Sequence, residues 1–133
     1  MKIGVPKETF AGENRVALTP DSALQLQKLG HECLVETGAG QAAGISDAAY
    51  ANAGVKLVKS ATELFKQADV LAKVRPPSAA EAKKLREGQT LISFFYPAQN
   101  KDLLDACNKQ GATVIAMDMV PRISRAQKMD ALS

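Results

Sequence analysis

Strand-like and helix-like patterns alternate along almost the whole chain, and this alternation restricts the possible fold more than any other feature. Six short β-rich runs occur, at residues 2–5, 32–36, 56–58, 69–74, 90–95 and 113–117. Polar helix caps and amphipathic stretches separate them. Strict alternation with short connections is typical of parallel strands joined by crossover helices. The sequence therefore predicts an α/β fold with a doubly wound, mainly parallel sheet of the Rossmann-like or flavodoxin-like kind.

Capping residues and glycines define the helices between these runs. Thr19 precedes Pro20 at the first helical position, and Gly30 closes that helix. The segment Ser78-Ala79-Ala80-Glu81 has the spacing of a capping box, in which a hydroxyl and a carboxylate satisfy each other's backbone N–H groups. The helix after this box is expected to end at Gly88, and polar caps at Ser46, Ser60 and Asn100 predict further helices over residues 46–54, 60–67 and 100–111.

Composition excludes several classes of function. The chain has 133 residues, 46% of them hydrophobic, which is enough for one domain with a packed core. The net charge is only +3 and the basic residues are dispersed, which argues against nucleic-acid binding. The longest apolar runs are far shorter than the roughly 20 residues that span a bilayer, so no membrane insertion is expected. Met1 enters a strand-like run at once and leaves no room for a signal peptide, which favours the cytosol.

Neither cysteines nor histidine predict a metal site. Cys33 and Cys107 lie singly among apolar neighbours, which is typical of reduced thiols in a core. His31 has no nearby cysteine, histidine or paired carboxylate, so we expect a histidine at the surface or at a helix end.

The segment Gly38-Ala39-Gly40-Gln41-Ala42-Ala43 matches G-x-G-x-x-A, the glycine pattern of dinucleotide-binding turns. The helix that such a turn should open begins only near Ser46. No acidic residue for a ribose hydroxyl stands about 20 residues further on. We therefore interpret the glycines as a structural turn.

Two cations are placed near the carboxyl ends of predicted strands. Arg15 follows the first strand, and Lys73 lies near the end of the fourth. A lysine in so apolar a strand needs an anionic partner, because burial of an unpaired ammonium is very unfavourable. The partner is either Glu8, Glu13 or Glu36 in a structural ion pair, or the anion of a bound substrate.

The terminal segment, residues 120–133, gathers arginines, an amide and a carboxylate directly after an apolar strand. Strand ends of this kind present ligand-binding groups in α/β proteins, so we expect the chain to be part of a larger protein. Ser124 and Gln127 fit a capping box and are explained by helix initiation. Arg122 and Asp130 are not explained in this way. Arg122 and Asp130, together with the amide of Gln127, suit one of two ligands: a flat polar ring that carries a carboxamide, or a phosphate group.

Several motifs resemble a known family. Residues 1–8, 15–20, 35–40 and 72–74 of this chain resemble a shared amino-terminal half. It is found in alanine dehydrogenases and in the α subunit of proton-translocating NAD(P) transhydrogenases. Residues 95–100 and 120–127 resemble the transhydrogenases in particular. Alanine dehydrogenases have a histidine in the strand end that here reads Phe94-Phe95-Tyr96. Reductive amination of an oxo acid needs a proton donor at the reacting carbon, so this difference favours transhydrogenase.

The resemblance implies that residues 1–133 form the first half of a two-lobed NAD(H)-binding domain, whose second Rossmann half is absent. It implies that the nicotinamide is held for direct hydride transfer to NADP(H) on a partner domain, coupled to proton translocation. No side chain would act as a general acid or base. The implied cofactor-binding residues are Arg122, Ile123, Ser124, Arg125, Gln127, Asp130 and Ser133.

The same resemblance implies a setting for the domain. Its partners would be the remainder of the α subunit, an NADP(H)-binding domain, a membrane domain and a second copy in a homodimer. It would lie at the cytoplasmic face of the bacterial inner membrane, and the fragment alone would be inactive. Two alternatives stay open. One is an alanine dehydrogenase-like enzyme that binds pyruvate through Arg15 and Lys73, and the other is a non-catalytic binding or assembly module.

Overall fold

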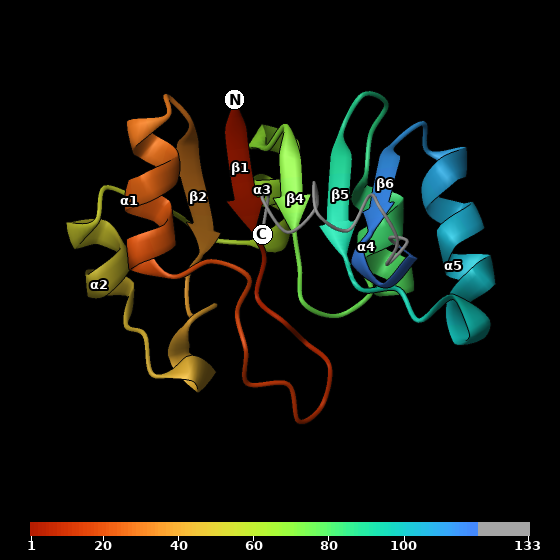
Figure 1. The fold of residues 1–133 in the computed structure, drawn as a ribbon, viewed down its shortest axis with the longest axis horizontal. Coiled ribbons are helices and arrows are strands. Elements are labelled where there is room, and N and C mark those ends of the chain that lie inside the picture. Colours follow the sequence, from red (N-terminus) through yellow and green to blue (C-terminus); the bar gives the residue numbers. More distant parts are fainter. Residues whose placement is uncertain (120–133) are drawn as a thin grey trace, which may run out of the picture.

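The computed structural model describes residues 1–119 and confirms the expected α/β fold. Six strands form one sheet in the order β3-β2-β1-β4-β5-β6, and all neighbouring strands are parallel (Figure 1). The strands are β1 (Lys2–Val5), β2 (Glu32–Glu36), β3 (Lys56–Val58), β4 (Val70–Ala72), β5 (Thr90–Ser93) and β6 (Thr113–Ala116). The α-helices are α1 (Pro20–Lys28), α2 (Asp47–Asn52), α3 (Ala61–Gln67), α4 (Ala79–Lys84) and α5 (Pro97–Lys109). Two 3₁₀ turns, η1 (Gln41–Ala43) and η2 (Met117–Met119), complete the elements.

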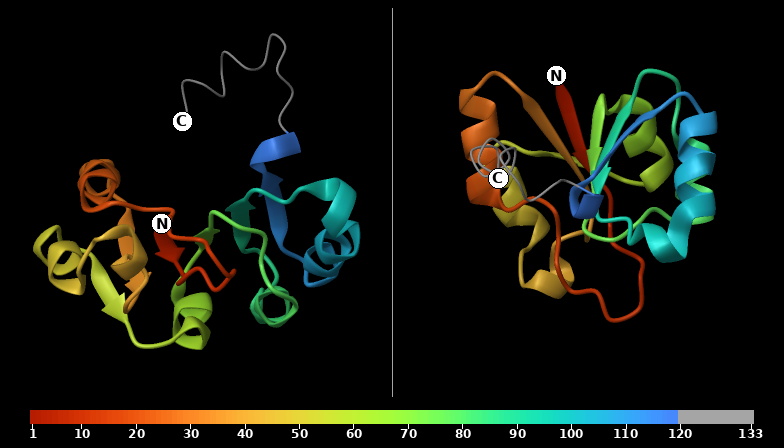
Figure 2. Two further views of the ribbon diagram at one scale, coloured as in Figure 1. Left: turned by 90° about the horizontal axis from the view of Figure 1, so that it is seen from below. Right: turned by 45° about the vertical axis from the view of Figure 1, so that its right-hand side comes forward.

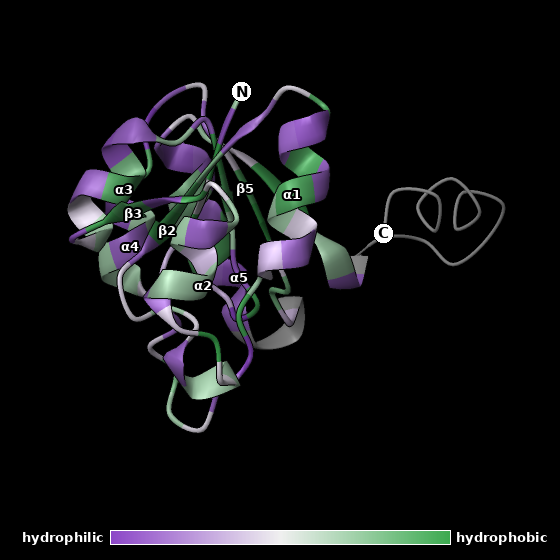
Figure 3. Cartoon of the chain, turned by 90° about the vertical axis from the view of Figure 1, so that its left-hand side faces the viewer, coloured by the Kyte–Doolittle hydropathy of each residue, from purple (hydrophilic) through white to green (hydrophobic). Residues whose placement is uncertain are grey.

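Helices cover the sheet from both sides. Along β2, Cys33 and Val35 pack into one apolar cluster with α1 and α2, whereas Leu34 between them packs into the other cluster with α3, α4 and α5. This division follows from the alternation of side chains along a strand. In Figure 3 green, hydrophobic residues dominate the strands inside, whereas the helices outside alternate green and purple, hydrophilic residues. The doubly wound arrangement predicted from the sequence is therefore confirmed.

The predicted caps account for the positions at which helices begin. The hydroxyls of Thr19, Ser46, Ser60 and Ser78 each accept a backbone N–H from the residue three positions further on. Each bond satisfies an N–H group that has no partner within its own helix. The capping box at Ser78 is complete. Local polar signals therefore fix where these helices start.

Other predicted boundaries were wrong. Helix α4 ends at Lys84 rather than at Gly88, because Leu85 turns to an extended conformation and is buried. Helix α5 begins at Pro97, and Asn100 lies at a kink with non-helical angles instead of at the start. The strands expected over residues 69–74 and 90–95 were too long. Strand β4 covers only Val70–Ala72, and β5 covers only Thr90–Ser93.

The glycines of residues 38–43 form a structural turn, as expected. The 3₁₀ turn η1 follows them, and the next helix begins only at Asp47. A Cβ atom on Gly40 would lie 2.7 Å from the ring of Tyr50 and 2.9 Å from the backbone oxygen of Ile45. Gly40 therefore allows the turn to pack closely against a buried tyrosine, which explains this glycine without a phosphate.

The remaining expectations concern single residues. Cys33 and Cys107 are free and buried, as predicted. Burial raises the pKa of the Cys107 thiol to about 11, so this group is a poor nucleophile. His31 is half-buried just after α1. Within residues 1–119 there is no cluster of metal-ligating side chains and no helix long and apolar enough to cross a membrane.

Candidate functional site

The order of the strands reverses at the centre of the sheet, between β1 and β4. In open parallel sheets, ligands bind beside the carboxyl ends of the strands at such a reversal. Residues 6–19 follow β1 there as a long loop, and residues 73–78 follow β4. Figure 2, left, looks onto this edge and shows both connections on it. The topology therefore predicts that a ligand would lie against the side chains of residues 6–19 and 73–78.

Lys73 is buried in a compact charge cluster at this edge. Its Nζ atom lies 3.2 Å from Oε1 of Glu8 and 3.4 Å from Oε1 of Glu81, and the three side chains are 1%, 3% and 8% exposed. Glu8 also accepts the backbone N–H groups of Val74 at 2.8 Å and Arg75 at 3.1 Å. One ammonium group thus faces two carboxylates, and the cluster ties the loop after β1 to β4 and α4.

Arg15 lies on the same edge but is held differently. Its Nε and Nη2 atoms both donate to Glu13 at 2.9 Å, and its side chain is 63% exposed. Glu13 also accepts from Nε of Arg75 at 2.8 Å. Hydrogen bonds from Arg15 and Arg75 outweigh the effect of burial and hold the pKa of Glu13 far below its usual value.

These contacts decide which expected ion pairs exist. Glu8 pairs with Lys73 and Glu13 pairs with Arg15, so two of the three proposed carboxylate partners are confirmed. Glu36 was wrong as a partner, because its carboxylate accepts the backbone N–H of Lys7 instead. A role of Arg15 and Lys73 toward a substrate anion stays a prediction.

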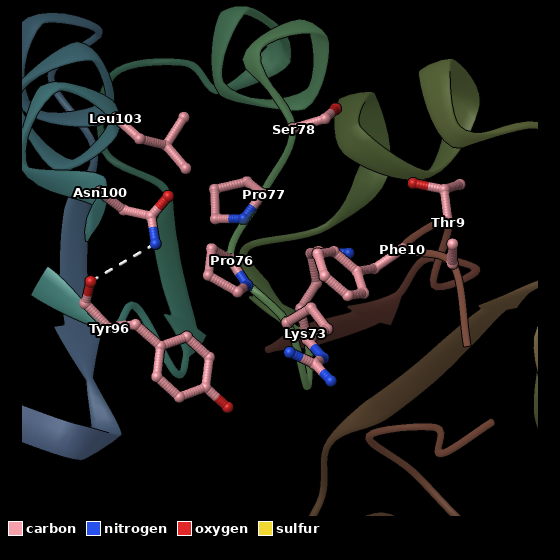
Figure 4. Close-up of a pocket in the computed structure, with 11 residues that line it drawn as sticks. Thr9, Phe10, Lys73, Pro76, Pro77, Ser78, Tyr96, Asn100 and Leu103 are labelled. Carbon is pink, nitrogen blue, oxygen red and sulfur yellow. Dashed lines mark hydrogen bonds between the residues drawn. The ribbon is translucent and has the colours of Figure 1, made fainter. Parts of the chain in front are cut away.

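A cavity of about 500 Å³ opens beside this charge network. The guanidinium carbon of Arg75 lies 4.3 Å from the ring centroid of Phe10 and 6.0 Å from that of Tyr96, distances typical of cation–π contacts. Figure 4 shows Phe10 and Tyr96 on opposite sides of the cavity, with Pro76 and Pro77 between them. The cavity therefore combines flat apolar walls with one partly exposed cation.

The turn between β5 and α5 forms another wall of the cavity and is unusually well fixed. Tyr96 has a φ of 49°, in the left-handed region. The carboxylate of Asp118 accepts the backbone N–H of Phe95 at 2.9 Å and that of Tyr96 at 2.5 Å, while the Asn100 amide donates to the Phe95 carbonyl at 2.8 Å. Burial opposes ionisation of Asp118, but the backbone N–H groups outweigh it and lower the pKa of this carboxyl.

The sequence-based cofactor residues lie elsewhere in the chain. All seven are outside the described residues 1–119: Arg122, Ile123, Ser124, Arg125, Gln127, Asp130 and Ser133. The charge cluster of Lys73, the contacts of Arg75 with Glu13, Phe10 and Tyr96, and the turn held by Asp118 together form what we call the strand-end site. Sequence reasoning missed three of its members, Glu81, Arg75 and Asp118. Only the capping box at Ser78 marked Glu81, and that motif says nothing of a lysine on a neighbouring strand.

Residues 1–119 do not fit the pyrophosphate of a dinucleotide. The loop that joins β1 to α1 contains a single glycine, Gly12. At the start of α1, the hydroxyl of Thr19 already accepts the backbone N–H of Ser22. A phosphate-binding turn needs several glycines directly before a helix. Of the two glycines at positions 38 and 40, Gly40 is explained by its close packing against Tyr50.

Comparisons with known proteins agree with this architecture. The family described as "Alanine dehydrogenase/PNT, N-terminal domain" matches residues 4–133. The chain is 70% identical over 133 residues to NAD(P) transhydrogenase subunit alpha of Cereibacter sphaeroides, covering all of this chain and 25% of that protein. It is 42% identical over 120 residues to alanine dehydrogenase of Mycobacterium tuberculosis, covering 90% of this chain and 32% of that protein.

A solved structure gives the same result in three dimensions. A transhydrogenase from Sinorhizobium meliloti superimposes with a TM-score of 0.89 at 39% sequence identity, over 99% of this chain and 39% of that chain. The chain thus spans about a quarter to a third of the length of the two curated relatives. Because the family match extends over nearly the whole sequence, the chain belongs to the alanine dehydrogenase/PNT N-terminal domain family.

Proposed function

We propose that the chain is the first lobe of the NAD(H)-binding component of an NAD(P) transhydrogenase. In this proposal it positions the nicotinamide for direct hydride transfer between NAD(H) and NADP(H), coupled to proton translocation. The observation that carries the proposal is the 70% identity to a transhydrogenase α subunit over the entire chain. The identity to an alanine dehydrogenase is lower, 42%, and extends over fewer residues.

The charges at the strand ends support this choice over an oxo-acid enzyme. Lys73 faces two carboxylates, and Arg15 is held by Glu13, so neither cation stands unopposed to attract a carboxylate substrate. The chain's one histidine, His31, directly precedes β2 at the opposite edge of the sheet. An oxo-acid enzyme needs a proton donor at the reacting carbon, and this histidine is on the wrong side to serve.

Hydride transfer between two nicotinamides makes a different demand on the protein. NAD(H) supplies the hydride itself, so the chain has to orient the ring and manage charge beside it. Arg122, Gln127 and Asp130 are the residues that we assign to this task. The amide of Gln127 and the hydroxyl of Ser133 offer hydrogen bonds to a carboxamide. Asp130 offers a negative charge that neutralises Arg122 or favours an oxidised ring.

The proposal includes the rest of the protein. Residues 1–133 would be one domain followed by a second Rossmann half, which would hold most of the dinucleotide. An NADP(H)-binding domain and a membrane domain would be its partners, a homodimer its assembly, and the cytoplasmic face of the inner membrane its location.

The test is the transfer rate of alanine variants of Arg122, Gln127 and Asp130 in the complete protein. Each should slow stopped-flow hydride transfer by up to about 100-fold while changing NADH affinity little, because a 1 Å misplacement has a cost of that size. Lys109→Ala, at the exposed end of α5, is the matched control. Wild-type transfer in all three variants would refute the assignment, and so would pyruvate- and ammonia-dependent NADH oxidation by the complete protein.

A further inference from the structure

The carboxylate of Asp118 connects the ends of two neighbouring strands. Asp118 lies in η2, directly after β6, and its two oxygens accept the backbone N–H groups of Phe95 and Tyr96, just after β5. Each oxygen therefore has its own donor. A carboxylate that only ended a turn would need one such bond, whereas this one fixes the turn after β5 at two points.

The conformation of this turn requires such a hold. Within residues 1–119, Tyr96 is the one non-glycine residue with a positive φ. The left-handed region costs an L-residue roughly 1–2 kcal/mol, and it persists where surrounding contacts impose it. Here Asp118 binds the N–H side of the turn and Asn100 binds the Phe95 carbonyl. Strained residues of this type cluster at functional sites.

The held turn contributes directly to the strand-end site. The ring of Tyr96 lies 6.3 Å from that of Phe94, stacked at 21°, and 6.0 Å from the guanidinium carbon of Arg75. Arg75 in turn shares Glu13 with Arg15. A continuous series of contacts thus runs from Asp118 across the ends of β5 and β4 to the loop after β1.

The same aspartate stands immediately before the proposed nicotinamide-binding segment. Arg122 follows it by four residues, and four residues reach at most about 14 Å even when extended. The position of Asp118 therefore limits how far from η2 Arg122 can lie.

We propose that Asp118 is a positioning residue for hydride transfer. By holding the amides of Phe95 and Tyr96, it fixes η2 against the turn after β5, and thereby the place from which the chain continues to Arg122, Gln127 and Asp130. This inference rests on the proposed function. Asp118 needs no contact with the cofactor, because it acts through the backbone that carries the binding residues.

Two substitutions in the complete protein test the role. Asp118→Asn keeps the size of the side chain but replaces one acceptor oxygen with an NH₂ group, which only donates. One of the two backbone N–H groups therefore loses its acceptor. Asp118→Glu keeps both acceptors. Asp105→Asn, exposed on α5, makes the same chemical change away from the turn and is the matched control.

We expect Asp118→Asn to slow stopped-flow transfer from NADH to NADP⁺ at least about tenfold while NADH affinity changes less than about twofold. Hydrogen exchange of the peptide covering residues 94–100 should become faster in this variant. Asp118→Glu should restore most of the rate, and Asp105→Asn should behave as wild type. A merely structural role would not separate rate from affinity.

Wild-type transfer in Asp118→Asn would overturn the inference. Equal losses of rate and affinity, or a rate loss no larger than the unfolded fraction measured by melting, would overturn it as well. The parallel alanine variants of Arg122, Gln127 and Asp130 separate the two proposals. If those three are slow and Asp118→Asn is not, only the positioning role fails, whereas wild-type rates in those three refute the proposed function itself.

Discussion

At the scale of the residue, the carboxylates of the strand-end site are distinguished by the donors that surround them. Glu13 accepts from two arginine side chains, and Asp118 accepts from two backbone amides. Such donors favour the ionised form, so each lowered pKa links protonation to the integrity of the fold. Glu13 is the clearer case, because its side chain is only 3% exposed.

Glu13→Gln should make the stability of the protein less dependent on acidic pH. The folded pKa of Glu13 lies below the unfolded value of about 4.3, so its stabilisation is present above that value and is lost as pH falls through the folded pKa. At pH 7 the variant should melt at a lower temperature than wild type, and the difference should shrink as the pH falls below about 4. Melting curves between pH 7 and pH 2 measure this, with exposed Glu87→Gln as control. A constant difference at every pH would contradict it.

Gly40→Ala should destabilise the protein by about 1–3 kcal/mol without acting on NADH affinity. The new Cβ would overlap the ring of Tyr50 and the backbone of Ile45. Gly44→Ala is the control, because it adds a Cβ in open space and is strained only by a φ of 80°, which costs about 1 kcal/mol. Denaturant unfolding and NADH titration of the complete protein provide the two readouts. Weaker NADH binding at unchanged stability would instead indicate a phosphate-binding turn.

At the scale of the element, the charge cluster of Lys73 joins β4, the loop after β1 and α4. Because Glu81 also completes the capping box of α4, one side chain serves both a helix start and a buried ion pair. The start of α4 and the buried ion pair at the end of β4 therefore depend on the same carboxylate. Removal of one partner from a buried cluster leaves the others without compensation.

Lys73→Met should therefore lower the free energy of unfolding by about 3–5 kcal/mol. It leaves Glu8 and Glu81 buried without their cation, although Glu8 keeps two backbone donors. Adding Glu81→Gln should recover part of the loss, since glutamine still suits the capping box. Exposed Lys83→Met on α4 is the control. An unchanged stability of Lys73→Met would show that the cluster is dispensable for folding.

Local signals predicted where four of the described α-helices begin, α1 to α4, but long-range contacts decided where several elements end. The caps Ser46, Ser60 and Ser78 act within three residues of sequence, so the pattern alone revealed them. Strand β4 stops early because the N–H of Val74 bonds to Glu8, 66 residues away. No local pattern contains that information.

The same distinction explains the site. The need of Lys73 for an anion was predictable from its apolar neighbours, and Glu8 was among the expected partners. The link between Asp118 and Tyr96 was not, because it spans 22 residues and depends on the adjacency of β5 and β6. A left-handed tyrosine has no sequence signature comparable to glycine.

At the scale of the whole molecule, the strand-end site is assembled from both halves of the sheet. The loop after β1 contacts the segment after β4, and that segment contacts the turn after β5; β4 and β5 both lie on the other side of the reversal. The described residues supply a cavity and charges but no phosphate-binding turn. The described residues alone therefore do not complete a dinucleotide site.

Residues 1–133 alone should bind NADH much more weakly than the complete protein. The phosphates contribute through backbone amides of a glycine-rich turn, and residues 1–119 lack such a turn before a helix. Isothermal calorimetry of the isolated chain, with its folded state verified by circular dichroism, is the measurement. Micromolar affinity for NADH in this fragment would contradict the expectation.

The central place of β1 also has a consequence for biosynthesis. β1 is made before the other five strands, yet it pairs with β2 on one side and with β4 on the other. Once β2 has docked, the opposite edge of β1 keeps its backbone groups unpaired until Val70 and its neighbours leave the ribosome. At a synthesis rate of about 5–20 residues per second, the nascent chain carries this open edge for about 2–7 s, an interval in which a chaperone can bind it and a neighbouring nascent chain can pair with it.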